Sequence, residues 1–499
     1  MMPDRDAYAK LEDRFARLEK LGEAIGFLDW DSQTMMPPGG AASRAEQMAT
    51  LKSIHHDLMT APEVGEWLGL AMAEGMSDGD PWRRANLREM HRQWVSATAV
   101  PADLVEALSR AESACEMTWR EARSRSDFSV VAPRLAELLG LVRQVARARG
   151  ERLGCSPYEA LLDQFEPDGR CARIDAVFAD LESFLPPFLA AVLERQGNPP
   201  PVPVGPFPVA RQRELGVRLM TALGFDFDHG RLDVSHHPFC GGSRDDVRIT
   251  TRYDEADFTS SLMGVLHETG HALYELGLPA AWRHQPVGRA RGMSLHESQS
   301  LLIEMQACRS RAFITFAAPL MRAAFAADGE AWETDALHRH YTRVKPDFIR
   351  VDADEVTYPA HVILRYRLEQ ALVAGTMEVR DLPDAWGQGM RTLLGLTPPD
   401  DRLGCLQDIH WYAGAFGYFP TYTLGAMTAA QLFDAACRAD PDVMPGLERG
   451  DFTPLLGWLR PHVHGMGSLL STDDLLTQAT GRPLDASVFK DHLRRRYHG

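Results

Sequence analysis

The feature that most constrains this chain of 499 residues is the motif His267-Glu268-x-x-His271, inside an apolar run over residues 260–276. In a helix, the two histidines would lie one turn apart on the same face. Two neutral imidazoles placed in this way can bind one Zn²⁺, with Glu268 beside them as a general base. Burying these polar groups among apolar neighbours costs free energy unless a partner satisfies them. The motif therefore predicts a metal-binding helix rather than a surface helix.

A catalytic zinc site needs a third protein ligand and one open position. Glu297 follows the motif near the start of the next predicted helix, and two neighbouring antiparallel helices would bring it to the metal. His296 is the alternative ligand, but it points about 100° away from Glu297 around the helix, so only one of the two can face the metal. We predict one divalent metal ion per chain, Zn²⁺, bound by His267, His271 and Glu297.

Bulk composition excludes several classes of function. The formal net charge of −16 argues against a nucleic-acid partner, because phosphate binding needs a basic surface. We find no apolar run of transmembrane length and no signal-peptide core at the N-terminus, so we expect no membrane association. The seven cysteines form no CxxC pair, which favours free thiols in a reducing compartment. We therefore expect a cytoplasmic protein.

Helical periodicity dominates the chain. It predicts a helix over residues 8–27, a breaker-rich loop over 28–40, a helix over 42–59 and further helices to about residue 196. Six prolines between residues 198 and 208 predict a stiff linker. We therefore divide the chain into an N-terminal helical region (1–197), a proline-rich linker (198–209) and a catalytic region (210–499) that forms one continuous peptidase unit.

Two short segments break the helical pattern before the metal helix. Residues 231–235 and 246–252 alternate between polar and apolar side chains and are separated by Gly241-Gly242, so we expect a small antiparallel sheet beside the metal helix. An exposed edge of such a sheet could pair with an extended peptide. After the metal helix, we expect one long helix over residues 294–316.

An irregular stretch at residues 404–422 gathers an imidazole and two phenols, those of His410, Tyr418 and Tyr422. Attack of a metal-activated water on a carbonyl carbon produces an oxyanion that needs hydrogen-bond donors besides the metal. We predict that these three side chains stabilise the oxyanion, with His410 and Tyr422 favoured. The alternative is an aromatic loop that only packs on the core.

Besides the metal motifs, further distinctive segments are Trp30-Asp31-x-x-Thr34-x-Met36-Pro37 with Gly39-Gly40, His237-Pro238-Phe239, Asp246-x-Arg248-x-Thr250, Ile349-Arg350-x-x-Ala353-Asp354-Glu355-Val356-Thr357-Tyr358, His361 with Arg365-Tyr366, and Gly404-x-x-Gln407-Asp408-x-His410-Trp411. Together these motifs resemble the carboxypeptidase Taq family of zinc metallocarboxypeptidases, a gluzincin-type HExxH family, over most of the chain. The chain departs from the family at Ile303-Glu304-Met305 and Cys308, where the family commonly has Trp-Glu-Asn and a later Gly; the departure concerns the surroundings of the ligands, not the ligands.

The resemblance implies a mainly α, large helical zincin-like fold with a deep active-site groove, in a homodimer. It implies a metal-dependent carboxypeptidase that removes single residues from the C-terminus of peptides with broad specificity, using zinc or cobalt. Its reaction would be attack by a zinc-activated water with Glu268 as general base. It also implies that the Asp-x-Arg-x-Thr and Gly-x-x-Gln-Asp-x-His-Trp segments close one end of the groove.

A closed groove accepts only chain ends and needs a cation for the substrate α-carboxylate. Arg365 and Arg248 are the candidates, with Arg350 next, because a guanidinium binds a carboxylate through two parallel hydrogen bonds. An internal salt bridge is the alternative for each. Two other functions compete: a helical zinc endo-oligopeptidase, which needs no such arginine, and a catalytically silent peptide-binding homologue, against which the intact metal motif argues.

Overall fold

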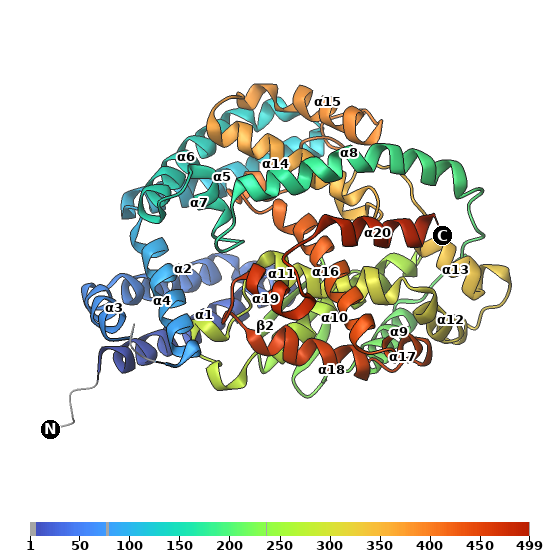
Figure 1. The fold of residues 1–499 in the computed structure, drawn as a ribbon. Coiled ribbons are helices and arrows are strands. Elements are labelled where there is room, and N and C mark those ends of the chain that lie inside the picture. Colours follow the sequence, from blue (N-terminus) through green and yellow to red (C-terminus); the bar gives the residue numbers. More distant parts are fainter. Residues whose placement is uncertain (1–5, 76–78, 236, 499) are drawn as a thin grey trace.

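A computed structural model describes residues 6–75, 79–235 and 237–498, and their helices form two layers and an end group (Figure 1). The upper layer in Figure 1 consists of α5 (Ala102–Arg125), α6 (Ala132–Leu153), α7 (Pro157–Leu162), α8 (Cys171–Arg195), α14 (Tyr358–Ala374) and α15 (Leu382–Leu394). The lower layer contains α9 (Val209–Ala222), α10 (Phe258–Gly277), α11 (Met293–Leu301), α12 (Arg311–Phe325), α16 (Pro420–Ala439), α17 (Val443–Arg449), α18 (Thr453–His462) and α19 (Thr472–Thr480). The end group is α1 (Ala7–Thr34), α2 (Ala41–Thr60), α3 (Pro62–Gly75) and α4 (Pro81–Thr98).

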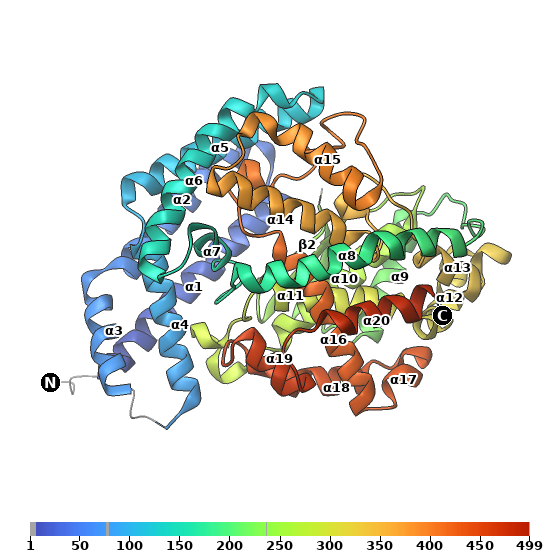
Figure 2. The same cartoon turned by 45° about the horizontal axis from the view of Figure 1, so that its top comes forward.

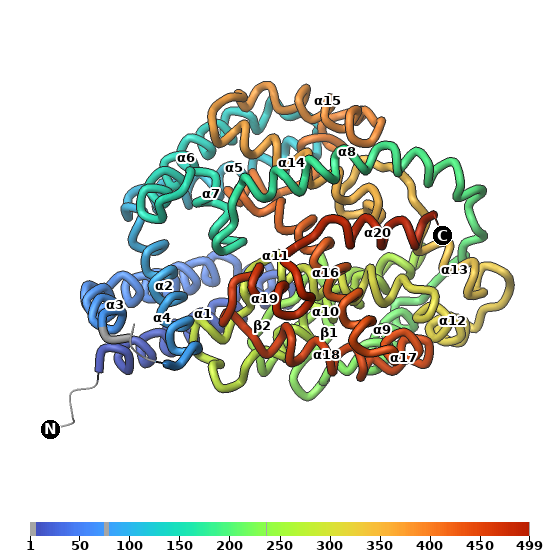
Figure 3. The backbone as a smooth tube through the Cα atoms, in the orientation of Figure 1, coloured from blue at the N-terminus to red at the C-terminus, as the bar shows by residue number. Residues whose placement is uncertain are grey.

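Segments far apart in the sequence lie side by side across these layers. Figure 2 shows α14 between α8 and α15. The last helix, α20 (Ala486–Tyr497), lies beside α8, as the trace in Figure 3 also shows, and Lys490 forms a salt bridge of 2.7 Å with Asp180 of α8. A further helix, α13 (Thr334–Tyr341), follows α12. The mainly α fold expected from the sequence is confirmed.

The first helix is longer than its sequence predicts. α1 continues to Thr34, so the loop expected from residue 28 is wrong over its first seven residues. The strong helix breakers begin only at Pro37, and the extension buries the indole of Trp30. The helix expected over residues 42–59 is confirmed as α2.

The largest hydrophobic core extends from Ala111 to Leu493. Helices α5–α8 therefore share a core with the helices that follow the proline-rich segment, which is neither helix nor strand between α8 and α9. A separate cluster joins α1–α4. The three-part division of the chain stays a prediction.

Helix α8 is long and unusually apolar. By length and composition α8 could cross a membrane, contrary to our finding of no such run in the sequence. Its residues Phe178, Leu181 and Leu185 belong to the large core. Because core helices of soluble proteins often have this composition, a single such helix is weak evidence of a membrane span.

The sheet beside the metal helix has three strands, β1 (Gly230–Val234), β2 (Phe239–Ser243) and β3 (Asp246–Thr251), in the order β1-β3-β2. β1 runs parallel to β3, and only β2 is antiparallel to it. The expected antiparallel pairing of the first and last segments is therefore wrong. The segment with Gly241-Gly242 forms a strand itself, so the chain reverses twice and the outer segments point the same way. Leu232 and Ile249 pack on α10 through Val265.

The helix after the metal helix is also divided. In place of one helix over 294–316, α11 passes into a π-helix, η5 (Leu302–Cys308), and α12 begins after Ser310. The Ser310 side chain accepts a hydrogen bond from the Phe313 amide, which starts a new helix there. A π-helix changes the direction of the side chains that follow it, and here it carries Glu304 toward the metal helix.

Two glycines allow the helices at the centre to approach closely. A Cβ on Gly270 of α10 would lie 2.5 Å from the carbonyl oxygen of Gln299 in α11. A Cβ on Gly425 of α16 would lie 2.9 Å from Cβ of Glu297. These contacts set the distance between the helix of the two histidines and the helix of Glu297.

We predict that Gly270→Ala pushes α10 and α11 apart. The added methyl group should cost about 1–3 kcal/mol of stability and weaken metal retention. The matched control is Gly264→Ala in the same helix, because a Cβ there meets nothing within 4 Å. Thermal unfolding and elemental analysis of dialysed protein measure both effects. Equal metal content in the two variants would contradict the prediction.

Candidate active site

The predicted ligands come together between α10 and α11. The ligand atoms of His267, His271 and Glu297 all lie within 4.8 Å of one another. Nε2 of His267 is 3.8 Å from one carboxylate oxygen of Glu297, and Nε2 of His271 is 3.7 Å from the other. His296, the alternative ligand, instead contacts Glu275 at 2.9 Å through its Nε2. Two imidazoles and a carboxylate that converge in this way fit a divalent metal ion.

Glu304 orients the first histidine. Its carboxylate lies 2.9 Å from Nδ1 of His267, which leaves Nε2 to face Glu297. Burial raises the pKa of Glu304, but the Arg309 guanidinium and the bond to His267 outweigh it and hold the pKa at about 2. We assigned Glu304 no role from the sequence. The available signal was its place in Ile303-Glu304-Met305, the segment where the chain departs from the family pattern.

Glu268 has the environment of a general base. It is buried beside the two histidines on α10. Burial raises its pKa to about 7, although the charge of His267 lowers it. A carboxylate with a pKa near the working pH is suited to accept and return a proton during a reaction.

The predicted oxyanion donors also lie together, in the segment we call the catalytic loop (residues 404–422). Nε2 of His410 is 3.1 Å from the hydroxyl of Tyr422, and the rings of Tyr418 and Tyr422 are 5.1 Å apart. Burial lowers the pKa of His410 to about 4 and raises that of Tyr422 to about 12, so both groups are neutral at pH 7. The charge of Glu297 contributes to the raised pKa of both phenols, and α16, which begins within this segment, packs against the Glu297 side chain at Gly425.

Arg365 is too deeply buried to bind the substrate α-carboxylate, the role predicted for it from the sequence. Its side chain has no exposed surface, and its guanidinium donates to Asp408, to Gln407 and to the carbonyl of His361. It therefore cannot contact a substrate carboxylate directly, and the internal salt bridge considered as the alternative is the arrangement found. The burial of Arg365 could not be predicted from the sequence, because the residues that enclose its side chain are distant in the chain.

The other two arginines retain some exposed surface. The side chain of Arg248 is 22% exposed, pairs with Asp246 at 2.6 Å and lies over the rings of Phe27 and Trp30 at 4.7 Å. The side chain of Arg350 is 6% exposed. Its guanidinium lies 4.5 Å from the ring centroid of Tyr422, and its charge lowers the pKa of Glu297, which burial raises. Of the three arginines considered, Arg350 therefore best fits a residue that binds the substrate carboxylate beside the metal ligands.

Asp408 connects the buried arginines. One carboxylate oxygen accepts hydrogen bonds from Arg350 and the other from Arg365. Burial raises the pKa of Asp408, but the two guanidinium groups outweigh it and hold the pKa well below its usual value. Asp408 belongs to the Gly-x-x-Gln-Asp-x-His-Trp segment, and no local sequence signal predicts that it pairs with two arginines.

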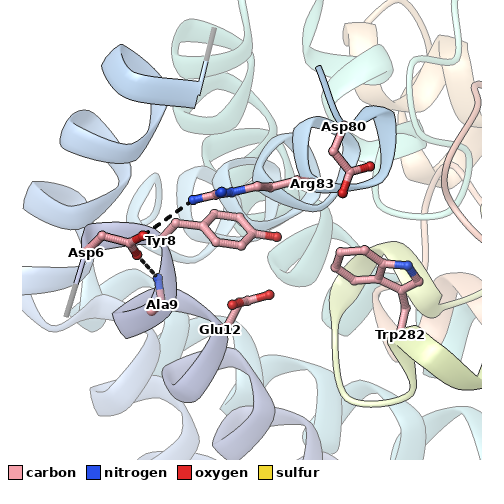
Figure 4. A pocket seen from close by; sticks show the side chains of 7 residues that line it. All are labelled: Asp6, Tyr8, Ala9, Glu12, Asp80, Arg83 and Trp282. Carbon is pink, nitrogen blue, oxygen red and sulfur yellow. Dashed lines mark hydrogen bonds and ion pairs between the residues drawn. The ribbon is translucent and has the colours of Figure 1, made fainter. Parts of the chain in front are cut away.

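A hollow lies on the surface, between α1, α4 and the segment after α10 (Figure 4). Its lining includes three acidic residues, Asp6, Glu12 and Asp80, with the guanidinium of Arg83 over the Tyr8 ring at 4.2 Å from the ring centroid. None of its lining residues belongs to the metal cluster or to the catalytic loop.

A helical fold with two histidines and a glutamate at the junction of two helices, and a glutamate beside them, defines a metallopeptidase of the HExxH class. The profile of the carboxypeptidase Taq (M32) metallopeptidase family matches residues 10–497. The chain belongs to this family. It is a metallocarboxypeptidase, and a divalent metal belongs to its site; the endo-acting and silent alternatives are not favoured.

Several named carboxypeptidases are similar to this chain over nearly its whole length. Thermostable carboxypeptidase 1 of Thermus thermophilus is 39% identical over 480 residues, 94% of each chain. Carboxypeptidase 1 of Bacillus subtilis is 35% identical over 492 residues, 97% of each chain. Among solved structures, Trypanosoma cruzi metallocarboxypeptidase 1 matches with a TM-score of 0.96 at 42% identity, covering 99% of each chain. An M32 carboxypeptidase from Deinococcus radiodurans matches with a TM-score of 0.93 at 36% identity, covering 98% of each chain.

We predict that Asp408→Asn lowers the free energy of unfolding by about 3–5 kcal/mol, because it leaves two buried guanidinium groups without their counter-charge. Asp434→Asn is the control, since its pair with Arg438 lies near the surface and should contribute about 0–1 kcal/mol. Thermal unfolding compares the two variants.

The pH dependence gives a second measure of Asp408. Because its pKa is lowered in the folded protein, its stabilisation is present above the ordinary value of about 3.9 and is lost as the pH falls below it. The difference between wild type and Asp408→Asn should therefore be constant near neutrality and shrink in acid. Similar losses in both variants at pH 7 would show that Asp408 does not hold the arginines.

Proposed function

We propose that this protein removes single residues from the C-terminus of peptides with broad specificity, and that its metal is Zn²⁺ held by His267, His271 and Glu297. The observation that carries the proposal is the convergence of these three ligands, with His267 oriented by Glu304. Two imidazoles and one carboxylate are a donor set of catalytic zinc sites. Cobalt is the alternative metal.

The protein residues have separate tasks in the proposed reaction. The bound metal would supply a Lewis acid and lower the pKa of water. Glu268 accepts the proton of the attacking water and returns it to the leaving amine, for which its raised pKa is suited. We assign stabilisation of the oxyanion to His410, Tyr422 and Tyr418, of which His410 and Tyr422, in contact with each other, are favoured.

Recognition of the chain end is assigned to the two arginines that keep some exposed surface, Arg350 with 6% and Arg248 with 22% of the side chain exposed. We propose Arg350 as the main partner of the substrate α-carboxylate, because it lies against Tyr422 and close enough to Glu297 to influence its pKa. Arg248 is the second candidate, from the partly exposed face of the sheet. Arg365 acts indirectly: by sharing Asp408, it fixes the position of Arg350.

The wider setting of the enzyme stays a prediction. Peptides are its partners. A cytoplasmic homodimer without nucleic-acid or membrane partners is proposed from the family resemblance and from the net charge of −16. Sedimentation of the purified protein tests the homodimer.

We predict that Glu268→Gln retains the metal but loses activity, because an amide cannot accept a proton from water. The fall in kcat should be at least about 10²–10⁴-fold, measured on a blocked dipeptide. Glu297→Ala provides the contrast, since it should lose the metal in elemental analysis after dialysis. Activity of Glu268→Gln within tenfold of wild type would remove Glu268 from this role.

We predict that wild type strongly prefers a free-acid peptide to its C-terminal amide. Arg350→Ala should lose most of this preference, because the lost charge-assisted bonds cost about 1.5–3 kcal/mol. Arg350→Lys should recover only part of it, since an ammonium lacks the planar fork. The ratio of kcat/KM for acid and amide, for these variants and for Arg248→Ala, is the measurement. If all variants discriminate like wild type, another group binds the carboxylate.

A further inference from the structure

A buried carboxylate on α14 contacts the catalytic loop at two points. Glu369 has no exposed surface. One of its oxygens, Oε1, accepts a hydrogen bond from the indole Nε1 of Trp411 at 2.9 Å. The other, Oε2, accepts one from the backbone amide of Gly417 at 3.2 Å and one from the hydroxyl of Tyr158 on α7 at 2.7 Å. A single side chain thus joins α14, α7 and both ends of the segment between residues 411 and 417.

Both loop contacts are adjacent to proposed oxyanion donors. Trp411 follows His410 directly, and Gly417 directly precedes Tyr418. The rings of His410 and Tyr418 are 5.5 Å apart. Any shift of Trp411 or Gly417 would therefore move a donor whose position decides how well it meets the oxyanion. On this basis we propose that Glu369 is a positioning residue for the reaction, which holds His410 and Tyr418 in place by binding their neighbours. The proposal rests on the proposed function of the catalytic loop.

The conformation of Gly417 shows how tightly this end of the loop is packed. Its φ of +89° lies in the region that favours glycine. A Cβ there would be 2.8 Å from backbone atoms of Leu161 and Leu162 on α7. The amide of Gly417 is therefore fixed between α7 and the Glu369 carboxylate, and Tyr418 starts from this fixed point.

The chemistry of the three donors explains why a carboxyl group is required. The Trp411 indole and the Gly417 amide can only donate, whereas the Tyr158 hydroxyl can donate or accept. Burial raises the pKa of Glu369 to about 7, although its bonds to Tyr158 and Trp411 lower it, and Arg365 on the same helix also lowers it. When Glu369 is protonated, its hydroxyl can donate to Tyr158 while both oxygens still accept from the loop. The two loop contacts therefore persist in either protonation state.

A glutamine cannot reproduce these contacts. Its amide has one acceptor oxygen, and its NH₂ group would face either the Trp411 indole or the Gly417 amide, both of which are donors. Glu369→Gln must therefore break one loop contact while it changes the side-chain volume very little. Tyr158→Phe is the matched control, because it removes the third hydrogen bond and leaves both loop contacts intact.

The experiment uses the metal-loaded full chain. For Glu369→Gln and Tyr158→Phe we would measure kcat and KM on a blocked dipeptide, metal content, thermal unfolding and amide hydrogen exchange by mass spectrometry. For Glu369→Gln we expect kcat to fall by about 10²-fold, since small misplacement of a catalytic group has effects of this size. KM and metal content should hardly change, and exchange should increase in residues 404–422 but not in α10. Tyr158→Phe should keep kcat close to wild type.

Two results would overturn the proposal. One is an unchanged kcat in Glu369→Gln. The other is an equal fall of kcat in both variants with increased exchange throughout the protein, which would reveal a general loss of stability. If Glu369→Gln does not fold, Trp411→Phe deletes one loop donor and keeps the carboxylate: a lowered kcat at full metal content supports the proposal, and an unchanged kcat overturns it.

A different set of results would show that the catalytic loop does not stabilise the oxyanion. If His410→Ala, Tyr418→Phe and Tyr422→Phe each retained wild-type kcat while Glu369→Gln increased exchange only in residues 404–422, the oxyanion role would be wrong. Glu369 would then hold the loop without positioning any group for the reaction, which overturns its role in catalysis.

Discussion

The site depends on the close approach of α10, α11 and α16. Helix axes can come this near only where a side chain is absent at the crossing, and Gly270 and Gly425 provide those positions. The approach brings Glu297 against the two histidines of α10 and places α16, which carries Tyr422, against the Glu297 side chain at Gly425. The metal ligands and the proposed oxyanion donors therefore share one packing arrangement.

Around this centre, buried charges and polar groups are held by partners from other parts of the chain. Glu304 from the π-helix holds His267, Asp408 from the catalytic loop holds Arg350 and Arg365, and Glu369 from α14 holds the loop itself. Each carboxylate satisfies donors that would be costly to bury alone. The groups proposed to act on the substrate thus have little freedom to move, which suits a site whose donors must meet a charge that exists only in the transition state.

Several elements could be predicted because their signals are local. Helix α10 and the early helices α1 and α2 follow from apolar periodicity, since a helix satisfies its backbone within four residues. The predicted antiparallel pairing of β1 and β3 was wrong, because the middle strand β2 contains two glycines and carries little strand signal. Its presence adds a second chain reversal, so β1 and β3 run parallel. The interruption at η5 was missed for another reason: a π-helix is a rare, short insertion, and all seven residues of η5 are buried, so no alternation of buried and exposed positions marks the change.

The sequence by itself predicted the metal ligands and the general base, because a spacing of four residues fixes two histidines on one helix face before any tertiary contact forms, and the structure brings the three ligand candidates together. The sequence also determined the family, through motifs distributed along the chain. Only the tertiary structure decided which of the candidate arginines is fully enclosed, and we propose the substrate-binding arginine on that basis. Arg350 and Arg365 have the same chemistry and share Asp408, yet Arg365 is enclosed by residues such as Trp386 and Gln407, whose nearness no local pattern encodes. Burial is a property of the packed chain, and for a charged group it separates a binding residue from a structural one.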